Sequence, residues 1–460
     1  MTVHGPLGAT EAGALELRAP GLDTRTASSP TRLGLLGLAG LLATGLVVSI
    51  TAAGTDSLLP ESVRPVPSWL AGPFGATGLG LGVAPLIGVL ALMFASYAVA
   101  VHAADHLTAR SVLLCIAALH ALVLLAPPLV STDVFSYQAY ARMGSIYGAN
   151  PYLHGPAGIG LDPVYPFIGA KWVGSPTVYG PVFTVLSYAL ASVSIAASAL
   201  AYKAIAALAS LGIVAIVWNA ARLRGVDQVK AAALVGLNPL LVVYGVGGGH
   251  NDMLMLALAV AGVGLLLQHR DRLGGGSLVI AAGVKFTAGL LLPFALAGAG
   301  GRLSRSRRRD VLAGAAVAAA AVAALGFAIF GTGPLHLLGS ISKSQSEGDW
   351  HSIPGFISTR LGLPTLGHIV GVALAIVFVG VFCALLRRVW RGQLDWIDGA
   401  GWMVVALLIT ASSLLPWYVA WLMPLAALAT DRRLWRTSMA MTGAFLTIQV
   451  LGYIPHGLSL

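Results

Sequence analysis

Long apolar runs recur along the chain and are separated by short polar segments. The first covers residues 33–53, and runs of about 16 to 23 residues continue toward residue 454, a length that lets a helix cross the hydrocarbon core of a bilayer. Hydrophobic residues make up 57% of the 460 residues and charged residues only 10%, whereas a soluble domain carries roughly a quarter charged residues. The sequence therefore predicts an all-α polytopic membrane protein.

The basic residues are concentrated in short segments between the apolar runs. A formal net charge of +10 could suit nucleic-acid binding, but short basic clusters between membrane helices are typical of cytoplasmic loops. We therefore expect no nucleic acid among the partners. The clusters are Arg222, Arg224 and Lys230; Arg302, Arg305, Arg307, Arg308 and Arg309; Arg387, Arg388 and Arg391; and Arg432, Arg433 and Arg436.

Placing these clusters on the cytoplasmic side predicts a plasma-membrane protein with about 13 crossings, its N-terminus inside and its C-terminus outside. Residues 1–31 are polar and lack periodicity, which predicts a disordered cytoplasmic tail. Residues 32–460 are predicted to form a single membrane domain.

The apolar residues 182–223 are long enough for two crossings, but two crossings would leave Arg222 and Arg224 outside. Because the Lys and Arg content of a short loop strongly determines on which side of the membrane it lies, we interpret residues 182–200 as a juxtamembrane or partly inserted helix. A single crossing then ends near Leu223.

Residues 277–299 pose the same conflict, because one crossing would place the five-arginine cluster outside. Two half-helices hinged near Lys285 remove the conflict. A lysine in a lipid-facing helix is costly, whereas at a hinge it can face a cavity. Residues 400–413 and 418–430 are predicted to form a second pair of short helices that meet on the outer side.

The most polar part of the membrane domain is residues 131–181, predicted to be the first large outer loop. It combines acids, Arg, His and Lys with aromatic residues, Pro and Gly. A second outer loop is predicted over residues 331–367. Within these loops, Asp162, Lys171 and Lys343 are interpreted as solvated side chains.

Asp133 stands at the start of the first outer loop, in the segment DVFSYQAYAR. If this segment is helical, Tyr137 and Tyr140 share the face of Asp133, because residues four and seven apart lie on one side of a helix. Such a carboxylate could serve as a general base. The same spacing suits a helix N-cap equally well.

Four motifs in fixed order carry a family resemblance: S-T-D-V-F-S-Y-x-x-Y-x-R-M from residue 131, N-P-Y-x-H-G-P from residue 150, S-P-x-x-Y-G-P-x-F from residue 175 and G-G-x-H-N-D-M-L-M from residue 247. In these motifs the chain resembles the actinobacterial polyprenyl-phosphomannose-dependent α-(1→6)-mannosyltransferases. The resemblance implies the GT-C architecture of integral-membrane glycosyltransferases.

The resemblance further implies an inverting transfer of mannose on the outer membrane face. The donor would be polyprenyl-phosphate-mannose in the lipid bilayer, and the acceptor a mannan-type glycolipid, an α-(1→6)-mannan of lipomannan and lipoarabinomannan. The family's acidic residue in the first outer loop corresponds to Asp133, which would deprotonate the acceptor hydroxyl.

The other polar and aromatic residues of the outer side receive roles from the same resemblance. The candidates for binding the donor phosphate are Lys285, Arg142 and His351. The candidates for binding sugars, or for orienting Asp133, are Tyr137, Tyr179, His250, Asn251, Asp252, Trp350, Trp417 and Tyr418.

Many GT-C enzymes carry a second acid beside the first in this loop, and some of those bind a divalent metal. Here Asp133 is followed by Val134 and Phe135, and the next acid is Asp162. We therefore expect no metal or other cofactor to be essential.

The alternative function is a transporter or flippase for a lipid-linked sugar, which would place ionisable residues near the bilayer midplane and at both gates. Their concentration on one side favours an enzyme.

Overall fold

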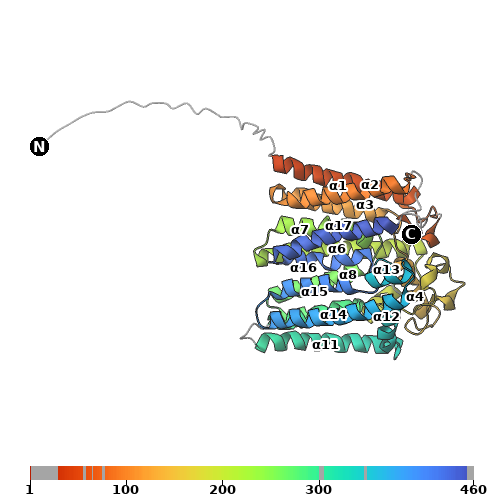
Figure 1. The fold of residues 1–460 in the computed structure, drawn as a ribbon. Helices are drawn as coiled ribbons and strands as arrows, with labels where there is room; N and C mark the ends of the chain where they lie inside the picture. Colours follow the sequence, from red (N-terminus) through yellow and green to blue (C-terminus); the bar gives the residue numbers. More distant parts are fainter. Residues whose placement is uncertain are drawn as a thin grey trace.

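The computed structural model describes Met1 and residues 29–54, 58–64, 66–74, 78–299, 305–346 and 350–452 (Figure 1). Helices and turns make up this part of the chain, and it contains no strand. The all-α prediction is therefore confirmed. Residues 2–28, most of the predicted tail, lie outside the described residues.

Five described helices are long and apolar enough to cross a membrane. They are α1 (Ser29–Gly54), α2 (Val83–His102), α6 (Ile195–Arg224), α11 (Arg305–Phe330) and α14 (Pro364–Trp390). The pair α7 (Gln228–Gly236) and η8 (Leu240–Val246), bent by 48°, could form a sixth span. Shorter apolar helices include α3 (Ala109–Leu125), α8 (Asp252–Leu267) and α15 (Trp396–Thr410). The chain is thus a helical membrane protein, and the count of about 13 crossings stays a prediction.

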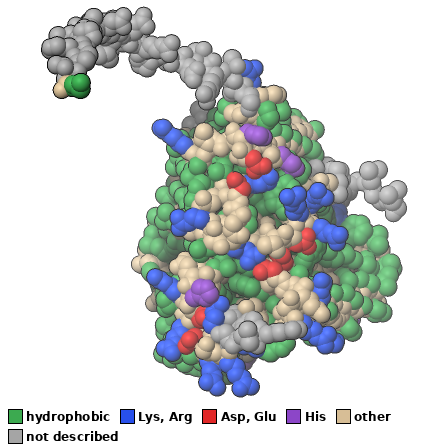
Figure 2. All heavy atoms as spheres, turned by 90° about the vertical axis from the view of Figure 1, so that its left-hand side faces the viewer, with side chains coloured by type: hydrophobic (Ala, Val, Ile, Leu, Met, Phe, Trp, Pro, Cys, Tyr) green, Lys and Arg blue, Asp and Glu red, His purple; other side chains and the backbone are tan. Residues whose placement is uncertain are grey.

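The long helices lie side by side in one bundle (Figure 1). The right-hand end carries α4 (Asp133–Ser145), α12 (Leu337–Ser346) and α13 (Ile353–Thr359). The left-hand end, seen face-on in Figure 2, displays many Lys and Arg side chains interspersed with acids. Helix α17 (Arg432–Gly452) completes the described chain, and the 3-10 turns η2 (Glu61–Val63), η3 (Gly72–Phe74) and η4 (Ala104–His106) join the first three helices.

Residues 182–200 do not form one helix. They contain α5 (Pro181–Tyr188), whose eight residues span only about 12 Å, followed by a break and the start of α6. The Ser194 hydroxyl accepts a hydrogen bond from the Ala197 N–H at that start, a typical N-cap. The 30-residue α6 is long and apolar enough for the predicted single crossing, but it begins at Ile195 inside the stretch interpreted as juxtamembrane.

The predicted hinge at Lys285 is confirmed. Helix α9 (Asp271–Val284) ends there, Lys285 is extended (φ −147°, ψ 121°), and η9 (Phe286–Leu290) leads into α10 (Leu291–Ala299). The second pair of short helices is also present, as α15 followed by η11 (Pro416–Trp421) and α16 (Met423–Leu428). Non-helical backbone at membrane depth is tolerated where protein or a water-filled cavity covers it.

The first outer loop is compact and fastened to the Lys285 hinge. After α4 it contains the 3-10 turns η5 (Pro156–Ile159), η6 (Tyr165–Phe167) and η7 (Ala170–Trp172), while η10 (Gly333–His336) opens the second loop. The Gly180 N–H donates to the Val284 carbonyl at 2.9 Å. A Cβ at Gly180 would stand 2.1 Å from the Gly283 oxygen, so only glycine allows this approach.

Candidate active site

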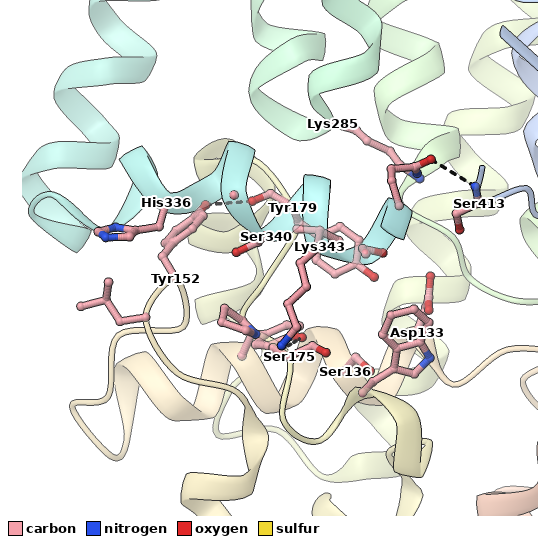
Figure 3. Close-up of a pocket in the computed structure, with 18 of the residues that line it drawn as sticks. Asp133, Ser136, Tyr152, Ser175, Tyr179, Lys285, His336, Ser340, Lys343 and Ser413 are labelled. Atoms are coloured by element: carbon pink, nitrogen blue, oxygen red, sulfur yellow. Dashed lines mark hydrogen bonds between the residues drawn. The ribbon is translucent and has the colours of Figure 1, made fainter. Parts of the chain in front are cut away.

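A cavity of about 690 Å³ lies between the first outer loop, the Lys285 hinge and α12 (Figure 3). Asp133 contributes a carboxylate from α4, Lys285 an ammonium from the α9–η9 break and Lys343 a second ammonium from α12. Tyr179 and Tyr418 add aromatic walls. Its size is that of an ordinary small-molecule site.

A second cavity of about 300 Å³ adjoins the first. Asp133, Trp172 and Leu415 line both cavities, while His351 and Trp417 line only the second. Asp133 is thus the one carboxylate among the described residues that lines both spaces. Two compounds bound in the two cavities would meet at this residue.

Asp133 is the first residue of α4 and makes no side-chain cap, because the N-cap position belongs to Thr132. Its Oδ2 accepts hydrogen bonds from the Tyr137 hydroxyl at 3.3 Å and from His250 Nδ1 at 3.0 Å. The side chain keeps 23% of its surface exposed. The predicted shared face with Tyr137 is present, and the N-cap alternative is not what the structure shows.

The glycine-rich turn before α8 positions His250. Gly249 has φ +65°, and a Cβ there would stand 2.5 Å from Val134 Cγ1, so glycine is required for both its conformation and its contact. The His250 side chain is 1% exposed and stacks on Trp417 with ring centroids 3.7 Å apart. Stacking fixes the imidazole with Nδ1 toward Asp133.

The environment of Asp133 favours its ionised form. Burial raises the pKa of this carboxyl, but the hydrogen bond and charge of His250, and then the charge of Lys285, more than offset burial and hold that pKa below its usual value. Hydrogen bonding and opposite charge stabilise a carboxylate in this way. Asp133 is therefore an anion at neutral pH and can accept a proton.

Lys285 is held by Asp252, the first residue of α8. Its Nζ donates to the two carboxylate oxygens of Asp252 at 2.7 and 2.9 Å, and the Trp421 indole N–H donates to Oδ1 at 2.8 Å. The ammonium also lies 4.7 and 5.3 Å from the ring centroids of Tyr418 and Trp421. Lys285 thus faces the larger cavity as a desolvated, oriented cation.

The predicted site residues divide into those that touch the cavities and those that lie behind them. Tyr137 packs edge-on against Tyr179 at 4.9 Å, and its hydroxyl accepts the Asn251 backbone N–H at 3.1 Å. The Asn251 side chain is buried and lines neither cavity. The Trp350 ring lies tilted by 32° against that of His351, with centroids 4.0 Å apart, and Trp350 lines neither cavity. Asp252 is buried behind Lys285, so its carboxylate does not reach the space where a sugar could bind.

Arg142 is placed differently from its predicted role. Its Nε pairs with Asp162 Oδ2 at 2.7 Å, its Nη1 donates to the Ala191 carbonyl at 2.8 Å, and it lines neither cavity. Asp162 is 2% exposed rather than solvated, and Tyr147 also donates to it. Burial raises the pKa of Asp162, yet the hydrogen bonds from Val164, Arg142 and Tyr147 keep it below its usual value. The guanidinium therefore fastens the outer loop.

We predict that Arg142→Met lowers stability, because it leaves the Asp162 carboxylate buried without its ion-pair partner. Loss of one member of a buried pair costs about 3 kcal/mol or more. Thermal unfolding of the purified protein in lipid nanodiscs measures the effect. Lys171→Met is the matched control, since Lys171 is exposed, with its Nζ 4.9 Å from the Trp172 ring centroid. Unchanged stability of Arg142→Met would contradict the structural role.

Several residues that line the cavities were not predicted from the sequence to belong to the site. Lys343 lines the larger cavity although it was interpreted as solvated, and His336 and Tyr152 line it as well. The i+4 spacing of Trp417 and Trp421 could have drawn attention to Trp421. Within the described residues no group of three His, Cys, Asp or Glu side chains could hold a metal ion. The absence of an essential metal stays a prediction.

Residues 31–300, more than half of the chain, match the family described as "alpha-(1->6)-mannopyranosyltransferase, N-terminal domain". The chain belongs to this α-(1→6)-mannopyranosyltransferase family. Residues 177–448 also match glycosyltransferase family 87. The family resemblance seen in the four motifs is thereby confirmed.

Named relatives cover most of the chain. Two α-(1→6)-mannopyranosyltransferases of Mycobacterium tuberculosis are each 30% identical, over 67% and 72% of this chain and 64% and 68% of their own lengths. α-(1→6)-Mannopyranosyltransferase B of Corynebacterium glutamicum is 28% identical over 74% of this chain and 61% of its own length. The chain thus spans somewhat less than two thirds of the first and last of these relatives. No solved structure matches the chain.

Proposed function

We propose that this protein is an inverting glycosyltransferase that moves mannose from polyprenyl-phosphate-mannose to an α-(1→6)-mannan acceptor of lipomannan and lipoarabinomannan. The observation that carries the proposal is Asp133, an anionic carboxylate held by His250 at the junction of two cavities, one of which presents Lys285. The sugar and the linkage are those for which the α-(1→6)-mannopyranosyltransferase relatives are named.

The chemistry needs one base and one cationic site. Asp133 takes the proton of the acceptor 6-hydroxyl while that oxygen attacks the anomeric carbon from the face opposite the phosphate. The C–O bond to the phosphate breaks, and its electron pair stays on the phosphate oxygen. Direct displacement converts a β-linked donor into an α-linked product without a sugar bound covalently to the enzyme. The departing phosphate monoester gains negative charge, which a preoriented cation stabilises.

The two cavities suggest how the substrates are arranged. The larger cavity has Lys285 and Lys343 on its wall, so we assign the phosphate and mannose of the donor to it. The smaller cavity is flanked by Trp172 and Trp417, whose rings suit the apolar faces of a sugar, and we assign the acceptor to it. His351 then lies on the acceptor side rather than at the phosphate.

The donor's prenyl chain needs an apolar path from the larger cavity into the bilayer. An apolar slot of about 30 Å³ lies between α8, η9, α10 and α15, lined by Met255, Leu291, Met403 and Trp421 among others, and it would have to widen to admit a prenyl chain. Trp421 links this slot to Lys285 through their shared partner Asp252. The basic left-hand end of the bundle supports a cytoplasmic location for that end and hence an outer-face location for the site.

A reconstituted assay tests the proposed function. Purified protein in lipid nanodiscs receives polyprenyl-phosphate-mannose and a short α-(1→6)-mannoside, and the product is examined by mass spectrometry and by NMR of the new anomeric centre. We expect an acceptor extended by one α-(1→6)-mannose and no product with GDP-mannose as donor. Absence of transfer together with movement of the lipid-linked sugar between leaflets of proteoliposomes would favour the transporter instead.

The pH dependence of transfer should report the contact between His250 and Asp133. His250→Phe keeps a ring for Trp417 but removes the donor to Asp133, so the pKa of Asp133 should rise. Because the anion is the active form, activity on the acid side should then be lost at a pH roughly one unit higher. Profiles of kcat/KM between pH 4 and 8 measure this shift. His250→Asn, whose amide can replace the Nδ1 donor, should move the profile less, and identical profiles for both variants and wild type would exclude the coupling.

A further inference from the structure

An apolar groove unrelated to the active site runs between α14 and α15 and has a volume of about 560 Å³. Val377, Val381 and Leu385 of α14 form one wall, and Val405 and Ile409 of α15 form the other. From Val377 to Arg388 the α14 wall is about 16 Å long. The apolar part of α14 has none of its most hydrophobic window buried inside the protein, so the groove opens to the bilayer.

Two arginines lie at one end of this groove, Arg388 in the last turns of α14 and Arg433 at the start of α17. Both are exposed, and neither forms an ion pair with a carboxylate of the described residues. Some other cations at this end of the bundle are paired, as Arg224 is with Asp395 at 3.0 Å and Arg307 with Asp271 at 2.7 Å.

The acid at this end of the groove, Asp431, already accepts hydrogen bonds from other groups. Asp431 lines the groove, but its Oδ2 accepts the Trp402 indole N–H at 3.1 Å and its Oδ1 accepts the Arg433 backbone N–H at 2.8 Å. The charge of the lining, two guanidinium groups and one hydrogen-bonded carboxylate, is therefore net positive. The groove is apolar along its length and cationic at the end that also carries the predicted cytoplasmic loops.

We infer that this groove binds an anionic membrane phospholipid, with its phosphate at Arg388 and Arg433 and an acyl chain along α14 and α15. Arginine is suited to phosphate because its planar fork of N–H donors matches the phosphate oxygens. Basic pockets between membrane helices on the cytoplasmic side are suited to anionic headgroups. The bilayer's inner leaflet provides such a lipid directly. A phospholipid fits the groove better than a soluble phosphate does, because only the lipid has an acyl chain to cover the apolar wall.

Trp402 lines the groove and provides an internal reporter. Full-length protein is reconstituted in nanodiscs that contain phosphatidylcholine and increasing amounts of phosphatidylglycerol, with bromine on the acyl chains of either lipid. The Trp402 signal is the difference between wild-type fluorescence and that of Trp402→Phe. We expect brominated phosphatidylglycerol to quench this signal at mole fractions where brominated phosphatidylcholine does not.

The Arg388→Gln/Arg433→Gln variant should reduce the preference for phosphatidylglycerol about 10-fold or more, since each basic residue near an anionic lipid contributes about one kcal/mol. The control, Arg387→Gln/Arg391→Gln, changes two neighbouring arginines that do not line the groove and should keep the preference. Equal quenching by both lipids, or equal loss in both double variants, would overturn the site. A Trp402 signal that neither lipid quenches would mean that another protein surface covers the groove, and would also overturn it.

Discussion

Asp133→Asn should lower kcat for mannosyl transfer by at least 100-fold. General-base catalysis contributes roughly 10²- to 10⁴-fold to a rate, and an amide cannot accept the proton of the acceptor hydroxyl. The Asn side chain is nearly isosteric, and its carbonyl can still accept from Tyr137 or His250, so binding of both substrates should change little. Single-turnover rates in nanodiscs, measured with saturating donor and acceptor, separate the chemical step from binding.

Asp105→Asn is the matched control for this variant. Asp105 is also a carboxylate paired with a cation, with Oδ2 3.2 Å from Lys230 Nζ, but it belongs to η4, next to the start of α3, and lines no cavity described above. This variant should transfer mannose at the wild-type rate. If Asp133→Asn retained most of the wild-type rate while folding normally, another group would have to be the base.

Reasoning from the positions of the arginine clusters predicted two features of the fold that the structure contains. The break at Lys285 followed from the cost of placing five arginines outside, and the structure has its break at that residue. The same reasoning predicted a single crossing that ends near Leu223, and α6, one continuous helix long enough to cross a membrane, ends at Arg224. Where α6 begins depends on the Ser194 cap and on the short α5, and a hydropathy pattern contains neither.

The partner with which each charged residue pairs could not be predicted in the same way. Arg142 and Lys285 are both cations within two residues of an aromatic residue in the sequence, yet one pairs with an acid 20 residues later and the other with an acid 33 residues earlier. His250 and Asp252 are two residues apart, but the start of α8 turns one toward Asp133 and the other toward Lys285. Lys203, which donates to the Pro127 carbonyl at 3.1 Å just before the outer loop, was overlooked within an apolar run.

Lys285→Met should lower kcat for transfer by about 100-fold or more. Removal of one preoriented group that stabilises developing negative charge typically costs a factor of 10² to 10³, and Lys285 is the candidate that lines the donor cavity from a fixed position. The same change should also destabilise the protein. It leaves the Asp252 carboxylate, whose side chain is only 1% exposed, without its cation, which costs about 3 kcal/mol or more.

A second substitution separates these two effects. In Lys285→Met/Asp252→Asn the buried charge is removed with its partner, and the Asn carbonyl can still accept from the Trp421 indole. We expect this double variant to recover most of the thermal stability but none of the transfer rate, because the phosphate still lacks its cation. Lys285→Arg, which keeps the charge with a different shape, should retain more activity than either. Recovery of transfer together with stability in the double variant would instead show that Lys285 serves the fold alone, and the stabilisation of the leaving phosphate would then have to come from Lys343.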